Sequence, residues 1–471
     1  GINMTRLCTL QGRQFGYNGV LSVGRVQTPV LGLVVHRDTE IGNFVSKPFY
    51  EVLCDLITLQ GEVYQAKWQP SSEYESHMDE DNRVLSKAVA QKIVAKVQNG
   101  TGKVVNTRQN KKATPPPLPY SLSTLQIDAA KRFGMSAQTV LDTCQNLYER
   151  HKLITYPRSD CRYLPREHLN DVNQVTNAIK KTCTKLSKAV EGADLNLKSK
   201  AWNDSKVSAH HAIIPTAQSV DLSRLSSAES NVYQLVARQY LIQFYLPFEF
   251  MDKQIDTEVS GELFVAKQKE VVSQGWKILF PTKPNAQDKS EYSSVNFPVV
   301  KIGDEVRSQQ VAIKEKNTTP PKHFTDATLL SAMTGIARYV TDPSIKKVLR
   351  DTDGLGTEAT RAGIIELLFK RQFLVRKGKD ILASKVGIQF ICSLPERMTT
   401  PDMTAHWESQ LESISQKEIR YLDFMGPIKN NLGVLVDEVK AVSFNGLEGL
   451  GKVSFKSKSS FKRSTKRKIK S

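Results

Sequence analysis

The chain has 471 residues, of which 39% are hydrophobic and 24% are charged. This length is more than one simple core supports, so it predicts several globular domains. The sequence shows no apolar run as long as a membrane span and no secretory segment, which predicts a cytoplasmic protein without membrane contact. The formal net charge of +18 favours a polyanionic partner, and nucleic acid is the commonest one.

The first part of the chain predicts helices followed by strands. Residues 1–45 are expected to be helical, and residues 49–68 alternate as strands do. The polar, acidic stretch 69–83 is expected to be an exposed loop, and residues 84–98 an amphipathic helix. The proline-rich run 114–119 then marks a stiff boundary.

Two short helices are expected after this boundary. Ser123 and Gln126 have the spacing of a capping box, Gly134 ends the first helix, and Ser136 caps the second. Two helices joined in this way are also typical of a helix-turn-helix. A DNA-binding regulator is therefore an open alternative.

The second half repeats the order of strands and helices. Residues 246–317 alternate as strands, and the chain is expected to be helical again from Phe324. Thr357 can cap a helix that starts at Glu358, and residues 371–384 have the pattern of a hairpin. A helix followed by a hairpin predicts a winged-helix-like module.

Both ends of the chain have notable features. Residue 1 is glycine and lies within an expected helix, which predicts that the natural amino terminus is upstream. The last 20 residues contain no acid and are expected to be a disordered tail that binds polyanions without sequence preference. The six cysteines form no C-x-x-C pair, so neither a zinc ribbon nor a disulfide framework is indicated.

The segment from Leu153 to Pro165 reads L-I-T-Y-P-R-S-D-C-R-Y-L-P and places Tyr156 two residues before Arg158. We expect Tyr156 to lie on an apolar strand that stops at Pro157. A phenol is a poor nucleophile at neutral pH, because its unperturbed pKa is about 10. A nearby cation favours the phenolate and neutralises charge on a phosphate under attack. Taken alone, such a tyrosine is more often a core residue than a nucleophile.

Four other segments combine residues suited to phosphate binding. Arg25 and Gln27 are expected near a helix start, where free N–H groups favour anions. A histidine pair in S-A-H-H-A-I-I-P-T could orient or protonate a phosphate oxygen. The remaining two are S-L-S-T-L-Q, residues 121–126, and D-G-L-G-T-E-A-T-R, which ends at Arg361.

These motifs occur together, in the order S-V-G-R-V-Q-T-P, S-T-L-Q, L-I-T-Y-P-R-S-D, A-H-H-A-I-I-P-T and G-L-G-T-E-A-T-R-A. In this order and spacing the chain resembles the type IA DNA topoisomerases, and within them the bacterial topoisomerase III branch. The resemblance implies a multidomain α+β fold, a toroidal core in which a strand-rich arch joins helical domains. It also implies a cytoplasmic bacterial protein that acts as a monomer on single-stranded DNA and needs no ATP.

The resemblance also implies roles for individual residues. Tyr156 matches the nucleophile that forms a 5′-phosphotyrosine, Arg158 the arginine that stabilises the scissile phosphate, and His210 the histidine of the A-H-x-A-I segment. The residues that match the strand-binding surface and its neighbourhood are Arg6, Arg13, Ser22, Val23, Gly24, Arg25, Val26, Gln27 and Arg361. The loop 69–83 lies where topoisomerase III has an insertion linked to decatenation.

The family's Toprim domain, which bears a catalytic glutamate and a D-x-D magnesium site, is expected to be absent from this chain. Asp79–Asp81 and Asp351–Asp353 spell D-x-D but follow no apolar strand, so both are interpreted as solvated. Mg²⁺ is thus expected for the full-length family, with its ligands outside this chain. A catalytically inactive fragment that only binds single-stranded DNA is the alternative.

The expected domains follow the alternation of helices and strands. Two helical parts form one body, two strand-rich parts form the arch, and the tyrosine lies in a separate helical domain. Their ranges are 1–45 (helical, first part), 46–119 (arch, first part), 120–245 (tyrosine domain), 246–320 (arch, second part), 321–440 (helical and winged-helix-like) and 441–471 (basic tail).

Overall fold

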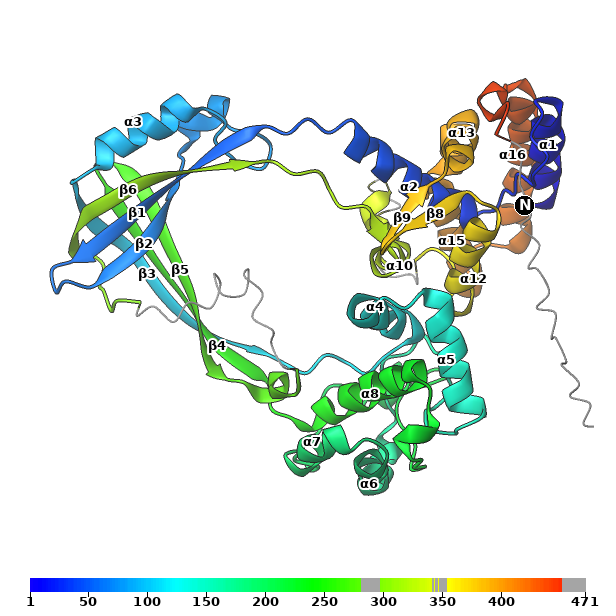
Figure 1. Cartoon of the computed structure of the whole chain (residues 1–471), viewed down its shortest axis with the longest axis horizontal. Coiled ribbons are helices and arrows are strands. Elements are labelled where there is room, and N and C mark those ends of the chain that lie inside the picture. Colours follow the sequence, from blue (N-terminus) through cyan, green and yellow to red (C-terminus); the bar gives the residue numbers. More distant parts are fainter. Residues whose placement is uncertain (281–296, 341–342, 344–345, 347–353, 451–471) are drawn as a thin grey trace, which may run out of the picture. The chain divides into compact units, whose positions relative to one another are not determined.

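The computed structural model describes residues 1–280, 297–340, 343, 346 and 354–450. The chain forms two compact units. Unit 1 comprises residues 1–38 and 332–471, and unit 2 comprises residues 39–331. Figure 1 traces the elements along the chain. Within the described ranges, no helix has the length and apolar character that a bilayer span requires.

The described α-helices of four or more residues are spread over both units (Figure 1). Their bounds are α1 Ile2–Gln14, α2 Gln27–Gly42, α3 Lys87–Val97, α4 Leu122–Phe133, α5 Ala137–Glu149, α6 Val172–Thr182, α7 Ser187–Glu191, α8 Ser227–Leu241, α10 Asp326–Thr334, α12 Glu358–Lys370, α13 Lys385–Ser393, α14 Glu396–Thr399, α15 Asp402–Ser415 and α16 Tyr421–Ala441.

Strands from both strand-rich ranges build one closed barrel in unit 2, in the order β1-β2-β5-β4-β3-β6. The barrel closes where β1 pairs antiparallel with β6, from Pro48 opposite Asn317 to Thr58 opposite Val306. The described strands are β1 Pro48–Thr58, β2 Val63–Gln69, β3 Thr101–Thr114, β4 Phe248–Val259, β5 Glu262–Ser273, β6 Glu305–Asn317, β7 Phe324–Thr325, β8 Leu374–Lys377 and β9 Asp380–Ala383.

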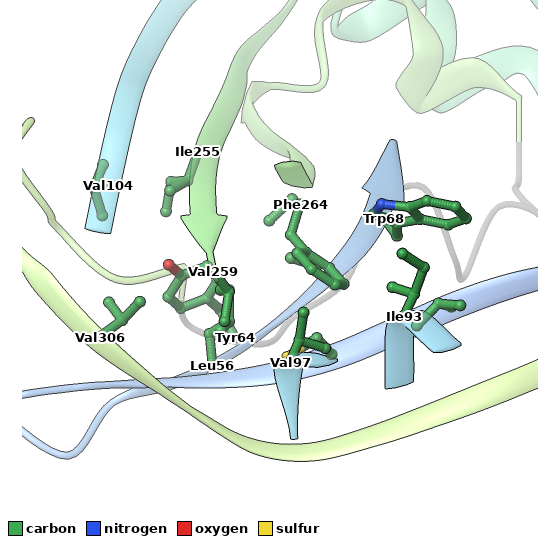
Figure 2. Close-up of a cluster of buried hydrophobic side chains, with 14 of the residues drawn as sticks. Leu56, Tyr64, Trp68, Ile93, Val97, Val104, Ile255, Val259, Phe264 and Val306 are labelled. Atoms are coloured by element: carbon green, nitrogen blue, oxygen red, sulfur yellow. The ribbon is translucent and has the colours of Figure 1, made fainter. Parts of the chain in front are cut away.

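The core of the barrel follows from the alternation of side chains along its strands. β2 alternates exposed and buried residues throughout its length. Figure 2 shows side chains from several strands, such as Leu56 and Phe264, pointing toward Ile93 and Val97 of α3. Helix α3 therefore packs its apolar face against the barrel, where it contacts β1 and β6.

A buried carboxylate fastens the loop between β2 and α3 to the barrel. Glu262 is 4% exposed and accepts hydrogen bonds from the Trp68 indole N–H at 2.9 Å and the Tyr74 hydroxyl at 3.0 Å. It also pairs with Lys96 Nζ at 2.5 Å. The stretch 69–83 is mostly exposed, as predicted, but it contains a 3-10 helix, Ser72–His77, and Tyr74 of that turn is anchored to the barrel.

The helical domain of unit 2 packs α4, α5 and α8 against one another. Its first helix starts two residues earlier than the predicted capping box implied. Ser121, not Ser123, is the N-cap, and Thr124 completes the box, whereas Ser123 is buried inside the helix. The predicted turn at Gly134 and the predicted cap at Ser136 are confirmed.

The proline-rich run 114–119 is fixed to this helical domain by side-chain donors. Gln239 and Gln243 on and after α8 donate to carbonyls of residues 117–119, and so does the guanidinium of Arg162. Because its prolines have no N–H to donate, the run cannot continue a regular helix or strand ladder, and side chains pair its carbonyls instead. The run is therefore a defined connection between the barrel and the helical domain.

Unit 1 contains the elements predicted after Thr357. Thr357 caps α12 through a capping box with Thr360, and β8 and β9 form the predicted antiparallel hairpin. Asp38 accepts a hydrogen bond from the backbone N–H of Ala383, which ties the first helical segment of the unit to this hairpin.

Two sequence predictions concern residues outside the described ranges. Most of the predicted tail 441–471, from residue 451 onward, lies outside them, and so does the pair Asp351–Asp353. The second D-x-D pair, Asp79–Asp81, lies in a turn in which Arg83 forms ion pairs with both carboxylates.

We expect Glu262→Ala to destabilise unit 2 by about 2–3 kcal/mol, because the buried indole N–H of Trp68 and the Tyr74 hydroxyl lose their acceptor. Urea denaturation followed by tryptophan fluorescence measures this loss. Glu262→Gln retains an acceptor oxygen and should lose less.

The matched control is Glu191→Ala, since Glu191 forms an exposed ion pair with Lys180. This variant should unfold at the wild-type urea concentration. Equal destabilisation by Glu262→Ala and Glu191→Ala would show that the buried carboxylate has no special role.

Candidate functional site

Tyr156 does not lie on a regular strand, contrary to the sequence prediction. A single bridge pairs Ile154 with Pro215, and the chain from Thr155 to Arg158 has neither helical nor strand structure. The ladder ends there because Pro157 has no N–H to donate. The tyrosine is therefore presented by a loop, not by the surface of a sheet.

Backbone hydrogen bonds hold this loop to two distant parts of the chain. Thr155 donates its N–H to the carbonyl of Ile214 at 2.9 Å, and its hydroxyl accepts from the N–H of Ile214 at 3.1 Å. On the other side of the loop, the N–H of Leu122 donates to the carbonyl of Ser159 at 2.9 Å. Ser159 is fully buried, so the residues that flank Tyr156 are fixed at both ends.

The ring of Tyr156 lies between two other aromatic rings and is 37% exposed. It stacks on the ring of His210 with centroids 4.5 Å apart and an interplanar angle of 22°. The ring of Tyr148 lies nearly perpendicular to it, at 5.8 Å and 84°. Two of the predicted catalytic residues, Tyr156 and His210, are thus brought together although 54 positions separate them in the sequence.

Arg158, the third predicted catalytic residue, is exposed. Its guanidinium makes no hydrogen bond or ion pair with the part of the chain that the structure describes. This state leaves its full set of donors for an incoming anion, and a guanidinium binds phosphate in a bidentate manner. By contrast, Arg162 in the same segment is used for structure, since it binds the carbonyls of Leu118 and Pro119.

His211, the neighbour of His210, is a structural residue. Its Nδ1 lies 2.8 Å from the carbonyl of Ala212, and because a carbonyl only accepts, Nδ1 carries the proton. Burial lowers the pKa of His211 below its ordinary 6.5, His168 and His210 lower it further, and the bond to Ala212 opposes them. The pair therefore divides into an exposed His210 and a half-buried His211.

The predicted DNA-binding residues belong to unit 1, where several of them line one pocket of about 650 Å³. The pocket contains three cationic side chains, and we call it the unit 1 pocket. Its lining includes Arg6, Arg13, Ser22, Val23, Gln27 and Arg371. A concave surface with three guanidinium groups favours an anionic ligand.

Side-chain hydrogen bonds join helix α1 to the segment that carries Ser22 and Gln27. The hydroxyl of Thr5 accepts from the N–H of Val23 at 2.9 Å, and the hydroxyl of Thr9 accepts from the N–H of Leu21 at 3.1 Å. Arg6 and Arg13 lie two turns apart on α1 and are both exposed. The helix thereby brings both cations to the wall of the pocket.

Two buried polar atoms of the unit 1 pocket lack a hydrogen-bond partner in the described chain. They are Ser22 Oγ and Arg371 Nε. Ser22 is 8% exposed. A buried hydroxyl without a hydrogen-bond partner lowers the stability of the fold unless a ligand or water pairs with it. Arg371 was missed by the sequence analysis, because its position after α12 resembles an ordinary helix end.

The other residues of the S-V-G-R-V-Q-T-P segment take different positions. Arg25 is exposed and forms an ion pair with Glu408 at 3.0 Å. The N–H of Gly24 donates to the Thr28 hydroxyl at the start of α2, and Val26 is buried. Direct contact of these three residues with DNA stays a prediction.

Arg361 is placed inside the fold of unit 1. Its side chain is 1% exposed, and it donates to the carbonyl of Leu355 at 3.1 Å and to the carboxylate of Glu358 at 2.9 Å. These contacts brace the turn before α12. Its predicted contact with DNA stays a prediction, and the observed contacts are structural.

Replacement of Arg371 by alanine should weaken binding of a single-stranded oligonucleotide and lower the slope of log affinity against log salt by about 0.7, the value for one phosphate contact on a single strand. Fluorescence anisotropy with labelled oligo-dT over a series of NaCl concentrations measures both quantities.

Arg420→Ala is the control for this experiment, because Arg420 is an exposed arginine of unit 1 that pairs with Asp423 and lies outside the pocket lining. An unchanged salt slope for Arg371→Ala, or an equal change for Arg420→Ala, would contradict a role of the pocket in DNA binding.

The lowered pKa of His211 predicts a pH dependence of stability. The unfolded chain takes up a proton at this residue near pH 6.5, whereas the folded chain does so at lower pH. The unfolded state is therefore favoured as pH falls below 6.5, and stability decreases there. Thermal melts between pH 5 and 8 should show a smaller loss at acid pH for His211→Gln than for wild type.

His36→Gln serves as the control, since His36 is exposed in unit 1. It should retain the wild-type dependence on pH. If His211→Gln retained it too, burial of that imidazole would not govern acid stability.

Comparison with known proteins identifies relatives of this chain. A family model described as DNA topoisomerase matches residues 1–426. DNA topoisomerase 3 of Haemophilus influenzae is 49% identical over 99% of this chain and 73% of its own length. DNA topoisomerase 3 of Salmonella typhimurium is 50% identical over 96% of this chain and 69% of its own length.

A solved structure extends the comparison to the fold. The structure of full-length topoisomerase I from Thermotoga maritima superposes with a TM-score of 0.62, and the match covers 92% of this chain and 66% of that one. At 19% identity, this match bears on the fold alone. One conclusion follows from the motifs around Tyr156, from the family match over most of the chain and from relatives that are about 50% identical in sequence. The chain belongs to the type IA DNA topoisomerases and is an isomerase of the topoisomerase III kind.

Proposed function

We propose that Tyr156 is the nucleophile with which this topoisomerase breaks single-stranded DNA, and that Arg158 and His210 act beside it. The observation that carries the proposal is the exposed ring of Tyr156 stacked on His210. A core tyrosine would be buried and its hydroxyl paired, whereas this hydroxyl makes no hydrogen bond within the described chain. Its loop is nevertheless fixed at both ends, which suits a group that must meet one phosphate repeatedly.

The proposed step exchanges one phosphodiester for another. The Tyr156 hydroxyl oxygen bonds to phosphorus, the bond from phosphorus to the 3′ oxygen breaks, and the proton of the phenol is balanced by one gained by the leaving 3′ hydroxyl. The product is a 5′-phosphotyrosine and a free 3′ end. Because the two esters are of the same kind, rejoining is the reverse of cleavage and needs no ATP.

Arg158 and His210 have separate parts in this proposal. The unpaired guanidinium of Arg158 binds the non-bridging oxygens and offsets the negative charge of the transition state. His210, an exposed imidazole, orients the phenol by stacking and carries a proton to or from the reacting oxygens. No hydrogen bond joins His210 to Tyr156 in the described chain, so proton transfer requires rotation of a side chain or a bridging water.

DNA binding by unit 1 is assigned to the unit 1 pocket. Arg6, Arg13 and Arg371 supply charge for the backbone phosphates, and Ser22 and Gln27 supply polar groups at its wall. Binding of this kind depends on salt and has little dependence on sequence. We propose further that the chain acts as a monomer, which sedimentation of the purified protein tests.

The type IA family suggests dependence on Mg²⁺ in general. In the ranges that the structure covers, no three or more His, Cys, Asp or Glu side chains converge as metal ligands would. The described residues therefore do not fit a metal site, and no step above is assigned to a metal.

The proposal predicts a covalent adduct that depends on Tyr156. The chain is incubated with single-stranded oligonucleotides labelled at either end and Mg²⁺, then denatured and separated on a gel. Label at the 3′ end should move with the protein, and label at the 5′ end should move as a shorter free strand.

Tyr156→Phe should abolish the adduct and leave DNA binding unchanged, since it removes one hydroxyl and retains the ring. Tyr163→Phe is the control, because Tyr163 lies in the same segment and makes no ring contact with Tyr156 in the described structure. An adduct that survives in Tyr156→Phe, or one that is lost equally in Tyr163→Phe, would overturn the proposal.

A further inference from the structure

The orientation of the Tyr156 side chain depends on its ring contacts. Its backbone is irregular from Thr155 to Arg158, and its hydroxyl makes no hydrogen bond within the described chain. The rings of His210 and Tyr148 both pack against the phenol and restrain its rotation. Of these two, His210 is itself exposed and lies in a segment without helix or strand.

Tyr148, in contrast, belongs to helix α5, which packs into the core of the helical domain. It lies in the last turn of α5, next to Leu147, which is fully buried, and one turn after Cys144, which is also fully buried. The half-buried Tyr148 ring thus moves with the core of the helical domain. Its position does not depend on the loop that it contacts.

The turn after α5 adds a second constraint. Lys152 has a φ of 55°, and its carbonyl accepts from the hydroxyl of Thr216 at 2.6 Å. Its ammonium lies 5.7 Å from the centroid of the Tyr148 ring. This cation is attracted to the negative face of the ring. The same turn connects the end of α5 to the loop of Tyr156, so the helix that carries Tyr148 and the loop that carries Tyr156 are close in sequence.

We infer that Tyr148 is a positioning residue for the cleavage reaction: its ring, fixed on α5, holds the phenol of Tyr156 in the orientation from which it attacks. This inference rests on the proposed role of Tyr156 as nucleophile. A nearly perpendicular pair with centroids 5.8 Å apart is a favourable aromatic geometry. It depends on the ring of Tyr148 and not on its hydroxyl.

The inference predicts that Tyr148→Ala lowers the rate of adduct formation by about twofold to twelvefold, the range that loss of one aromatic pair produces. Affinity for the oligonucleotide and the melting temperature should change little. Tyr148→Phe keeps the ring and should restore the wild-type rate. A residue with a purely structural role would change stability and binding together with the rate.

A direct measurement of ring position does not depend on activity. The chain is labelled with 3-fluorotyrosine, and the ¹⁹F resonance of Tyr156 is assigned from its loss in Tyr156→Phe. In wild type the neighbouring rings displace this resonance from the value of a free tyrosine. Tyr148→Ala should move it toward the free value, and Tyr148→Phe should leave it in place.

Tyr163→Ala is the matched control, since Tyr163 contacts Lys206 and not Tyr156. An unmoved Tyr156 resonance in Tyr148→Ala, or an equal movement in Tyr163→Ala, would overturn the inference. These outcomes differ from failure of the proposed function, which would appear as an adduct that persists in Tyr156→Phe. If Tyr148→Phe failed to restore the resonance and the rate, the ring contact would also be excluded as the cause.

Discussion

The site depends on a small set of backbone hydrogen bonds that join three distant segments of unit 2. The loop of Tyr156 is bonded to Ile214 on one side and to Leu122 on the other, and the N–H of Ile213 donates to Tyr120. These bonds hold the loop in place of a continuous ladder, which Pro157 prevents.

The same logic separates residues that build the site from residues left free to act. Arg162, Gln239 and Gln243 all donate to carbonyls of the proline-rich run, whereas Arg158 has no partner in the described chain. In unit 1, Arg361 is buried and forms an ion pair with Glu358, whereas the Nε–H of Arg371 in the pocket wall has no acceptor in the described chain. A cation that folding has already satisfied contributes less to binding of a phosphate than one that it leaves unsatisfied.

The sequence predicted much of this arrangement, for identifiable reasons. Alternation predicted the strands, and local signals at Gly134, Ser136 and Thr357 predicted where helices end or begin. The capping box was predicted two residues late, because Ser121 and Ser123 both suit a cap. The extended backbone of Ser121 and the hydrogen bond from the Thr124 N–H to its hydroxyl decide between them. The closure of the barrel and the contact of Tyr148 with Tyr156 result from long-range pairing. No local pattern carries that information.

The proposed mechanism requires the loop of Tyr156 to receive the phosphate that reacts. A crystal structure of the chain with a bound single-stranded oligonucleotide would test it most directly. A backbone phosphate should lie within hydrogen-bond distance of both the Arg158 guanidinium and the Tyr156 hydroxyl. DNA bound elsewhere on unit 2, with the phenol still covered by His210 and no phosphate beside Arg158, would contradict the proposed mechanism.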